Sequence, residues 1–145
     1  MKKNVSTIAA IVIFAGMLPS ARAADTVATA DTPYKTAAGV TFTIPKTWSM
    51  RAQGPIVVLV APERDVHLAI VDAGNVSAAN TAVAKAWRLY DPAMHRRLRI
   101  ATSAPAREGW DEVRSFAYET SPNEHLVVGA TALRKAGRWT VAIVE

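Results

Sequence analysis

The chain has 145 residues, half of them hydrophobic, and carries a formal net charge of +5. That length and apolar content predict a single domain with a packed core and exclude a disordered chain. Because the chain contains no cysteine, disulfides, thiolate metal sites and thiol nucleophiles are excluded as well.

The first 23 residues carry the three parts of a secretory signal peptide. Lys2 and Lys3 form a basic start, residues 8–18 an apolar run, and residues 21–23 a small-residue ARA site. The apolar run is shorter than the roughly 20 residues that a membrane span needs. We therefore predict cleavage between Ala23 and Ala24, no stable membrane anchor afterwards, and a periplasmic or secreted product. An uncleaved N-terminal anchor is the alternative.

Cleavage also changes the charge of the exported chain. Three basic residues leave with the signal peptide, so 14 basic and 12 acidic residues remain, a net charge of +2. Nucleic-acid binding needs a concentrated basic face. We therefore expect no nucleic-acid partner.

The mature chain divides into a short tail and one domain. Residues 24–38 are small and polar without an apolar period, which predicts a flexible N-terminal tail. Residues 39–145 form the domain. Alternating or continuous apolar patterns within it predict strands at 39–44, 48–52, 56–61 and 66–71.

One helix is predicted, over residues 78–90. Five residues recur on one stripe at helical spacing: Ala79, Val83, Ala86, Trp87 and Tyr90. Ser77 is expected to cap the helix at its N-terminus. Pro92 is expected to end it, because the residue before a proline disfavours helical geometry.

The remaining strands follow the helix. We predict one at 96–101 and then three antiparallel strands within residues 109–145, separated by turns at 121–123 and 135–138. Strands on both sides of a single helix predict the α+β class, with a mainly antiparallel β-sheet packed by one central helix. Because the chain stops directly after an interior-type strand, we expect the front part of a longer protein. Natural closure of the sheet is the alternative.

No catalytic motif is visible, and we predict no catalytic residue, no cofactor and no metal. No serine lies in a G-x-S-x-G turn or precedes a lysine by three positions. His67, His95 and His125 are widely separated and lack metal-ligand spacing. An autonomous enzyme built on these histidines is the least favoured interpretation.

The acidic pairs have a structural explanation. Asp111 and Glu112 are neighbours on a predicted strand, so their side chains point to opposite faces. Glu63 and Asp65 lie in a predicted turn. We interpret all four as solvated charges, because general acid–base chemistry needs two carboxylates that face one cleft.

Two features are candidates for a ligand or partner surface. The basic cluster of Arg96, Arg97 and Arg99 suits an anionic ligand or an acidic partner. We favour the alternative, an exposed edge strand whose charge discourages aggregation. Trp87 is one of four tryptophans, which either line a ligand groove or, as we favour, pack in the core.

Six stretches of the chain resemble the N-terminal accessory domain of bacterial periplasmic serine hydrolases of the β-lactamase-like, penicillin-binding superfamily. They are IPKTWS at 44–49, LAIVD at 68–72, AKAW at 84–87, PAREGWD at 105–111, YETSPNE at 118–124 and LRKAGRWT at 133–140. The order of elements also resembles the PsbP/Mog1-like α/β sandwich, in which a further helix follows the last strand.

The resemblance implies that the C-terminal helix of the sandwich is missing and that a hydrolase domain with an S-x-x-K motif lies beyond residue 145. We accordingly expect an exported, non-catalytic N-terminal domain of a β-lactamase-like serine hydrolase, with the hydrolase domain as its partner. The alternative is a stand-alone periplasmic binding or interaction module.

Overall fold

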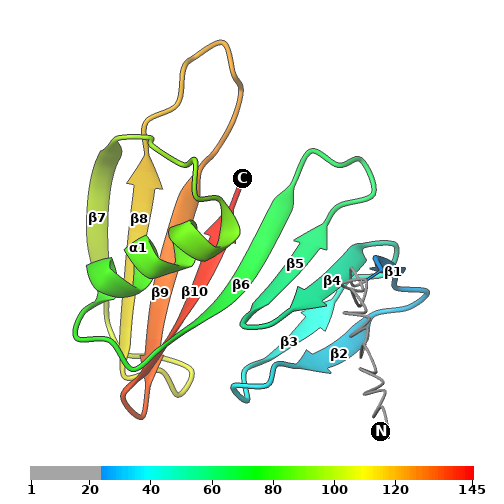
Figure 1. Cartoon of the computed structure of the whole chain (residues 1–145), viewed down its shortest axis with the longest axis horizontal. Helices are drawn as coiled ribbons and strands as arrows, with labels where there is room; N and C mark the ends of the chain where they lie inside the picture. The colour runs from blue at the N-terminus through cyan, green and yellow to red at the C-terminus, as the bar shows by residue number, and fades with distance from the viewer. Residues whose placement is uncertain (1–23) are drawn as a thin grey trace, which may run out of the picture.

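The structure is a computed structural model, and it describes residues 24–145. The predicted signal peptide and the Ala23 side of its cleavage site lie outside the described residues. Within them the chain forms ten strands and one helix (Figure 1). No helix of this part is long and apolar enough to cross a membrane.

Six strands precede the helix and four follow it among the described residues. The first six are β1 (Thr26–Val27), β2 (Thr32–Lys35), β3 (Thr41–Ile44), β4 (Ser49–Gln53), β5 (Ile56–Val60) and β6 (His67–Gly74). The helix α1 spans Ala79–Tyr90. It is followed by β7 (Leu98–Ala104), β8 (Glu112–Tyr118), β9 (Gly129–Lys135) and β10 (Arg138–Val144).

Eight of these strands form one antiparallel sheet in the order β1-β4-β5-β6-β10-β9-β8-β7. The predicted three-stranded meander is confirmed, since β8 pairs with β9 and β9 with β10. The last strand returns beside β6, from the first half of the chain. This central pairing joins the two halves into one sheet.

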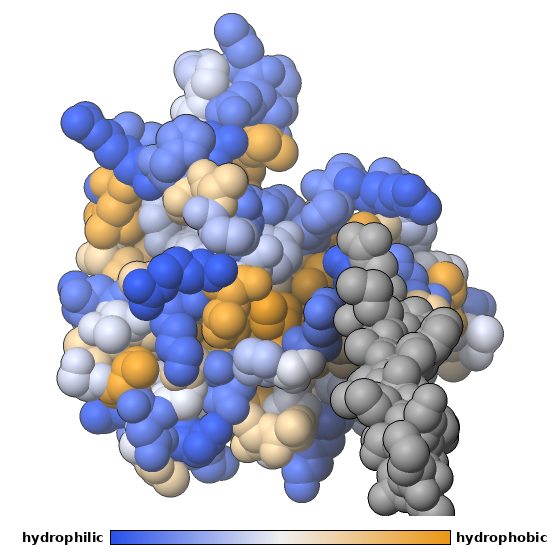
Figure 2. Space-filling model, in the orientation of Figure 1, coloured by the Kyte–Doolittle hydropathy of each residue, from blue (hydrophilic) through white to orange (hydrophobic). Residues whose placement is uncertain are grey.

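Helix α1 packs on one face of β6, β9 and β10, where it lies across the strands (Figure 1). Four of the five residues of the predicted apolar stripe are buried, which confirms the stripe: Ala79, Val83, Ala86 and Trp87. On this face of the molecule, hydrophobic side chains gather beside α1 in the middle of the view (Figure 2). The predicted cap is wrong, because the helix begins one residue later, with Ala78 at the N-cap and no capping side chain.

The hairpin of β2 and β3 forms a second, two-stranded sheet that packs through side chains on the opposite face of β5 and β6. Its Ile44 joins Val57 and Leu59 in a separate core. The rings of Tyr34 and Phe42 pair across the hairpin at 5.4 Å and border the same core. The large sheet is therefore covered in part by the helix on one face and in part by the hairpin on the other.

The predicted α+β class, a PsbP/Mog1-like α/β sandwich of a sheet and one central helix, is wrong. The structure is mainly β, with an eight-stranded and a two-stranded antiparallel sheet. The helix has only 12 residues and packs mainly on three of the eight strands, β6, β9 and β10, with a side-chain contact to β8 from Trp87 to Tyr118, so it does not form a layer. A hairpin supplies the cover that a second helix layer would provide.

Two boundaries also differ from the sequence prediction. Residues 24–38, expected to form a flexible tail, contain β1 and β2, because backbone pairing to β4 and β3 orders a segment that lacks an apolar pattern. The strand expected between the turns at 121–123 and 135–138 begins only at Gly129. Val127, which is 76% exposed, lies in the preceding loop.

Candidate functional site

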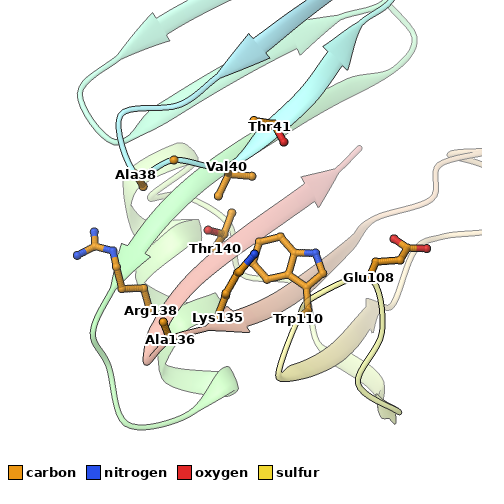
Figure 3. A pocket seen from close by; sticks show the side chains of 10 residues that line it. Ala38, Val40, Thr41, Glu108, Trp110, Lys135, Ala136, Arg138 and Thr140 are labelled. Carbon is orange, nitrogen blue, oxygen red and sulfur yellow. The ribbon is translucent and has the colours of Figure 1, made fainter.

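A groove of about 520 Å³ lies where the hairpin cover ends and the second half of the sheet begins. We call it the Trp110 groove (Figure 3). Residues 38–41 form one wall, and Trp110 and Lys135 form the other. Thr140 on β10 lies between them, with Glu108 and Arg138 toward the ends.

The loop that carries Trp110 is tightly constrained. The Trp110 backbone N–H donates to the carbonyl of Arg107 at 2.9 Å, and these two residues form an isolated β-bridge. Glu108 and Gly109 both adopt positive φ, 53° and 79°, which turns the chain back on itself within four residues. The backbone of Trp110 is consequently fixed beside the groove, which its half-buried side chain lines.

The turn on the other side is fixed by Asp111, whose carboxylate accepts a hydrogen bond from the Ala136 backbone N–H at 2.8 Å. The Asp111 backbone N–H in turn donates to the carbonyl of Arg134 at 2.8 Å. The side chain of Lys135 is thereby directed beside Trp110 (Figure 3). Asp111, predicted to be a solvated charge, has a structural function in this turn.

The polar groups of the groove include charges of both signs. Arg138 forms an ion pair with Asp72 at 2.7 Å, and its side chain points away from the centre of the groove (Figure 3). Lys135 contributes a positive charge, Glu108 a negative charge and Thr140 a hydroxyl group. Thr140 is only 6% exposed and also borders an adjoining hollow of about 90 Å³ together with Asp72.

A second surface is the face of β7–β10 that points away from α1. Three rows of cross-strand neighbours make up this face: Ile100, Ala117, Gly129 and Val144; Thr102, Ser115, Thr131 and Ala142; and Ala104, Val113, Leu133 and Thr140. All twelve residues are uncharged. Thr140 of the third row also lines the Trp110 groove.

We call the first two rows the bare face, because no element of the described chain packs on them. Ile100 is 56% exposed, and the rows border a shallow hollow of about 140 Å³. The hydroxyls of Ser115 and Thr131 lie 3.3 Å apart and bond to each other. On the opposite side of the same strands, Phe116, Ala130 and Ile143 are buried in the core that includes α1 residues.

The three arginines of the predicted basic cluster, Arg96, Arg97 and Arg99, make different contacts and do not form one site. Arg96 binds the Glu124 carboxylate with two hydrogen bonds, 2.9 and 3.1 Å long, which raises the pKa of the Arg96 guanidinium. The carbonyl of Arg97 accepts a hydrogen bond from the backbone of Glu119. Arg99 lies on the edge strand β7, which agrees with the edge position that we favoured for this residue. That its charge discourages aggregation stays a prediction.

The Arg96–Glu124 pair also fixes the loop between β8 and β9. Hydrogen bonding to Arg96, followed by a 2.6 Å bond from the Ser121 N–H, lowers the pKa of Glu124 to about 2. This carboxylate therefore remains ionised over almost the whole accessible pH range. The Arg96–Glu124 pair therefore stabilises the conformation of the loop between β8 and β9.

Trp87, a candidate for the ligand surface, lies in the core instead. Its side chain is 6% exposed, and its indole N–H donates to the Tyr118 hydroxyl at 2.9 Å. The two rings meet edge to face at 5.5 Å, and burial raises the pKa of Tyr118. The predicted surface role of Trp87 is therefore wrong, and the core interpretation is confirmed for this residue and for Trp139, which is also buried.

The three histidines do not form a site. His67 and His125 border one hollow of about 610 Å³ at the end of β10, whereas His95 contacts the carbonyl of Ala93. Within residues 24–145 no three His, Cys, Asp or Glu side chains are placed to hold a metal ion.

The other three residues of the acidic pairs do not line the Trp110 groove. Glu112 pairs with Arg134 at 3.2 Å, on the side of β8 opposite to the bare face. Glu63 and Asp65 lie exposed in the turn between β5 and β6.

Sequence reasoning missed most of the Trp110 groove. The sequence predicts only a turn for Lys135 and Arg138, no site role for Glu108, and the end of a tail and the start of a strand for residues 38–41. The available signal was an aromatic residue in a loop rich in charge and glycine, close to a basic turn. Their proximity depends on strand order, which a single sequence does not reveal.

No protein-family model matches the chain, and no curated protein and no solved structure matches it either.

Proposed function

We propose that this chain is an exported, non-catalytic domain that binds a partner protein through its bare face, and that the partner is a serine hydrolase domain of the β-lactamase-like class. The observation that carries the proposal is that the two rows of the bare face are uncharged and that no element of the described chain packs on them. The sheet is covered elsewhere by α1 and by the hairpin, so this face is the part of the scaffold left for a partner.

The chemistry of the bare face favours a protein partner. Its central row consists of Thr102, Ser115, Thr131 and Ala142, whose short side chains leave a flat surface that another element can approach closely. Because none of these residues is charged, a partner covers them without the large desolvation cost of an ion. Each Å² of apolar surface covered contributes about 25 cal/mol.

The identity of the partner rests on the resemblance. The six stretches that resemble the accessory domain of periplasmic serine hydrolases extend from residue 44 to residue 140, over most of the described domain. They support a hydrolase domain as the occupant of the bare face. The reading frame beyond the codon for Glu145 tests this point directly, since it is expected to encode an S-x-x-K motif.

A cysteine-accessibility experiment tests the surface itself. The chain has no cysteine, so Thr131→Cys places a unique thiol in the middle of the bare face. Thr43→Cys is a matched control on the exposed side of β3. Maleimide labelling rates are measured for residues 24–145 alone and for the product of the complete reading frame.

We expect the thiol at position 131 to react at least about tenfold more slowly when the hydrolase domain is present, because it is covered, and the thiol at position 43 to react equally in both. Equal labelling at position 131 in both forms would overturn the proposed surface. A reading frame without the S-x-x-K motif would overturn the hydrolase partner and favour the stand-alone interaction module.

A further inference from the structure

We propose that the Trp110 groove is a saccharide-binding site that accepts pyranose rings. The groove is separate from the bare face, and this inference does not depend on the identity of a protein partner. Its volume of about 520 Å³ falls within the range of roughly 300 to 1,000 Å³ that is usual for small-molecule sites.

The aromatic wall is the first element of this inference. Trp110 is half-buried and projects into the groove from a loop of constrained backbone (Figure 3). An indole has an electron-rich face and a large apolar area, so it packs well against the C–H groups on one face of a pyranose ring. The other exposed wall, residues 38–41, carries only small and aliphatic side chains with one threonine, which leaves room for a ring beside the indole.

The polar groups match the hydroxyls of a sugar. A sugar hydroxyl both donates and accepts hydrogen bonds, so its site needs donors and acceptors together. The ammonium of Lys135 only donates, the ionised carboxylate of Glu108 only accepts, and the hydroxyl of Thr140 does both. All three residues border the groove.

The charges of the groove also favour a polyhydroxyl ligand over a simple anion. Lys135 and Arg138 are balanced by Glu108 and by Asp72, which pairs with Arg138. A balanced set does not concentrate negative ions, and its attraction for a bare carboxylate is weak. A ligand rich in hydroxyl groups, by contrast, has a partner for each of these side chains.

Binding of two defined tetrasaccharides tests the inference. The exported chain is titrated with chitotetraose, a neutral sugar, and with tetragalacturonate, an acidic one. Calorimetry reports affinity, and the indole N–H resonances report which tryptophan is affected. Glu108→Gln and Lys135→Met remove one polar partner each, and Lys46→Met is the matched control for an exposed lysine outside the groove.

We expect at least one tetrasaccharide to bind and to shift the Trp110 indole resonance. Trp110→Ala should weaken binding about tenfold, the loss expected for one stacked aromatic ring. Glu108→Gln and Lys135→Met should weaken it several-fold, and Lys46→Met should have no effect. Because the two polar substitutions remove no buried apolar surface, they test the site even if Trp110→Ala impairs folding.

Three results would overturn the inference. The first is the absence of binding by both sugars at millimolar concentration. The second is binding that none of the groove substitutions weakens. The third is binding of tetragalacturonate alone that depends on Lys135 but not on Glu108 or Trp110, since this pattern indicates simple charge attraction.

Discussion

Trp87 shows how one residue joins the helix to the sheet. Its ring is buried and contacts both Tyr118 of β8 and Tyr90 of its own helix. We predict that Trp87→Ala lowers the free energy of unfolding by about 3 to 5 kcal/mol, the range for removing a large buried aromatic side chain. Urea denaturation followed by circular dichroism measures this value.

Tyr118→Phe separates the hydrogen bond from the packing of the ring. It leaves the Trp87 N–H without its hydroxyl partner, which should cost about 1 to 3 kcal/mol, while the aromatic contact remains. An almost unchanged free energy of unfolding in Trp87→Ala would show that the ring does not support the core.

Glu124 gives a prediction about pH. Its pKa of about 2 in the folded chain lies below its usual value of 4.5, so the unfolded chain binds a proton first as the pH falls. The stabilising contact with Arg96 is therefore complete above pH 4.5 and is lost as the pH falls through about 2. We expect the amide resonance of Ser121, which donates to Glu124, to report this titration by NMR.

Glu124→Gln is the control for this titration, because an amide has the same shape but no charge to lose. In this variant the Ser121 resonance should no longer follow the low-pH transition. A Ser121 titration with a midpoint near 4.5 in the parent chain would contradict a stabilising ion pair between Arg96 and Glu124.

At the level of elements, β7 is one of the two edges of the large sheet, and its outward backbone groups have no strand partner within the described chain. Leu98 and Ile100 are exposed on either side of Arg99, where the register with β8 also shifts. Charge and irregularity at an edge discourage pairing with a second chain. We predict that Arg99→Val promotes self-association, which sedimentation velocity over a range of protein concentrations detects.

Arg88→Val is the matched control for the edge strand. It removes the same charge from the last turn of α1, where the backbone N–H groups donate within the helix and no strand edge is open to a second chain. We expect this variant to remain in the oligomeric state of the parent chain. If Arg99→Val does so too, then Arg99 does not protect the edge.

At the level of the whole molecule, β6 connects the two cores. Ala69 and Val71 on one side of this strand belong to the helix core, whereas Leu68 and Ile70 on the other side pack against the hairpin core. Since one strand forms part of both, we expect the cores to unfold together. Leu59 is 1% exposed and belongs to the hairpin core, so a substitution there tests whether destabilising one core also destabilises the other.

We predict that Leu59→Ala lowers the free energy of unfolding by about 2 to 5 kcal/mol and destabilises α1 to the same extent as the hairpin. Hydrogen exchange of amides in β3 and in α1 measures both. Leu89→Ala on the exposed side of α1 should change stability by about 0.5 kcal/mol or less. Loss of protection confined to β3 would show that the two cores unfold independently.

Local patterns predicted most of the elements but not the class of the fold. The stripe that includes Val83, Ala86 and Trp87 identified α1, and the alternating residues of the last third identified the meander. The strands β1 and β2 were missed because Thr26–Val27 and Thr32–Lys35 have no apolar pattern of their own. Pairing with distant strands orders them, and such pairing has no local signal.

The sequence by itself determined which residues point inward along each strand and along the helix, because side-chain direction follows from the period of the backbone. Only the tertiary structure decided what covers each face. Strand order places β10 beside β6. The hairpin covers β5 and β6 on one face, and α1 covers β6, β9 and β10 on the other. The uncovered area on the hairpin side of β7–β10 forms the bare face and adjoins the Trp110 groove. Both surfaces join residues that are far apart in the chain, such as Val40 and Trp110, and a periodic pattern carries no information about such distances.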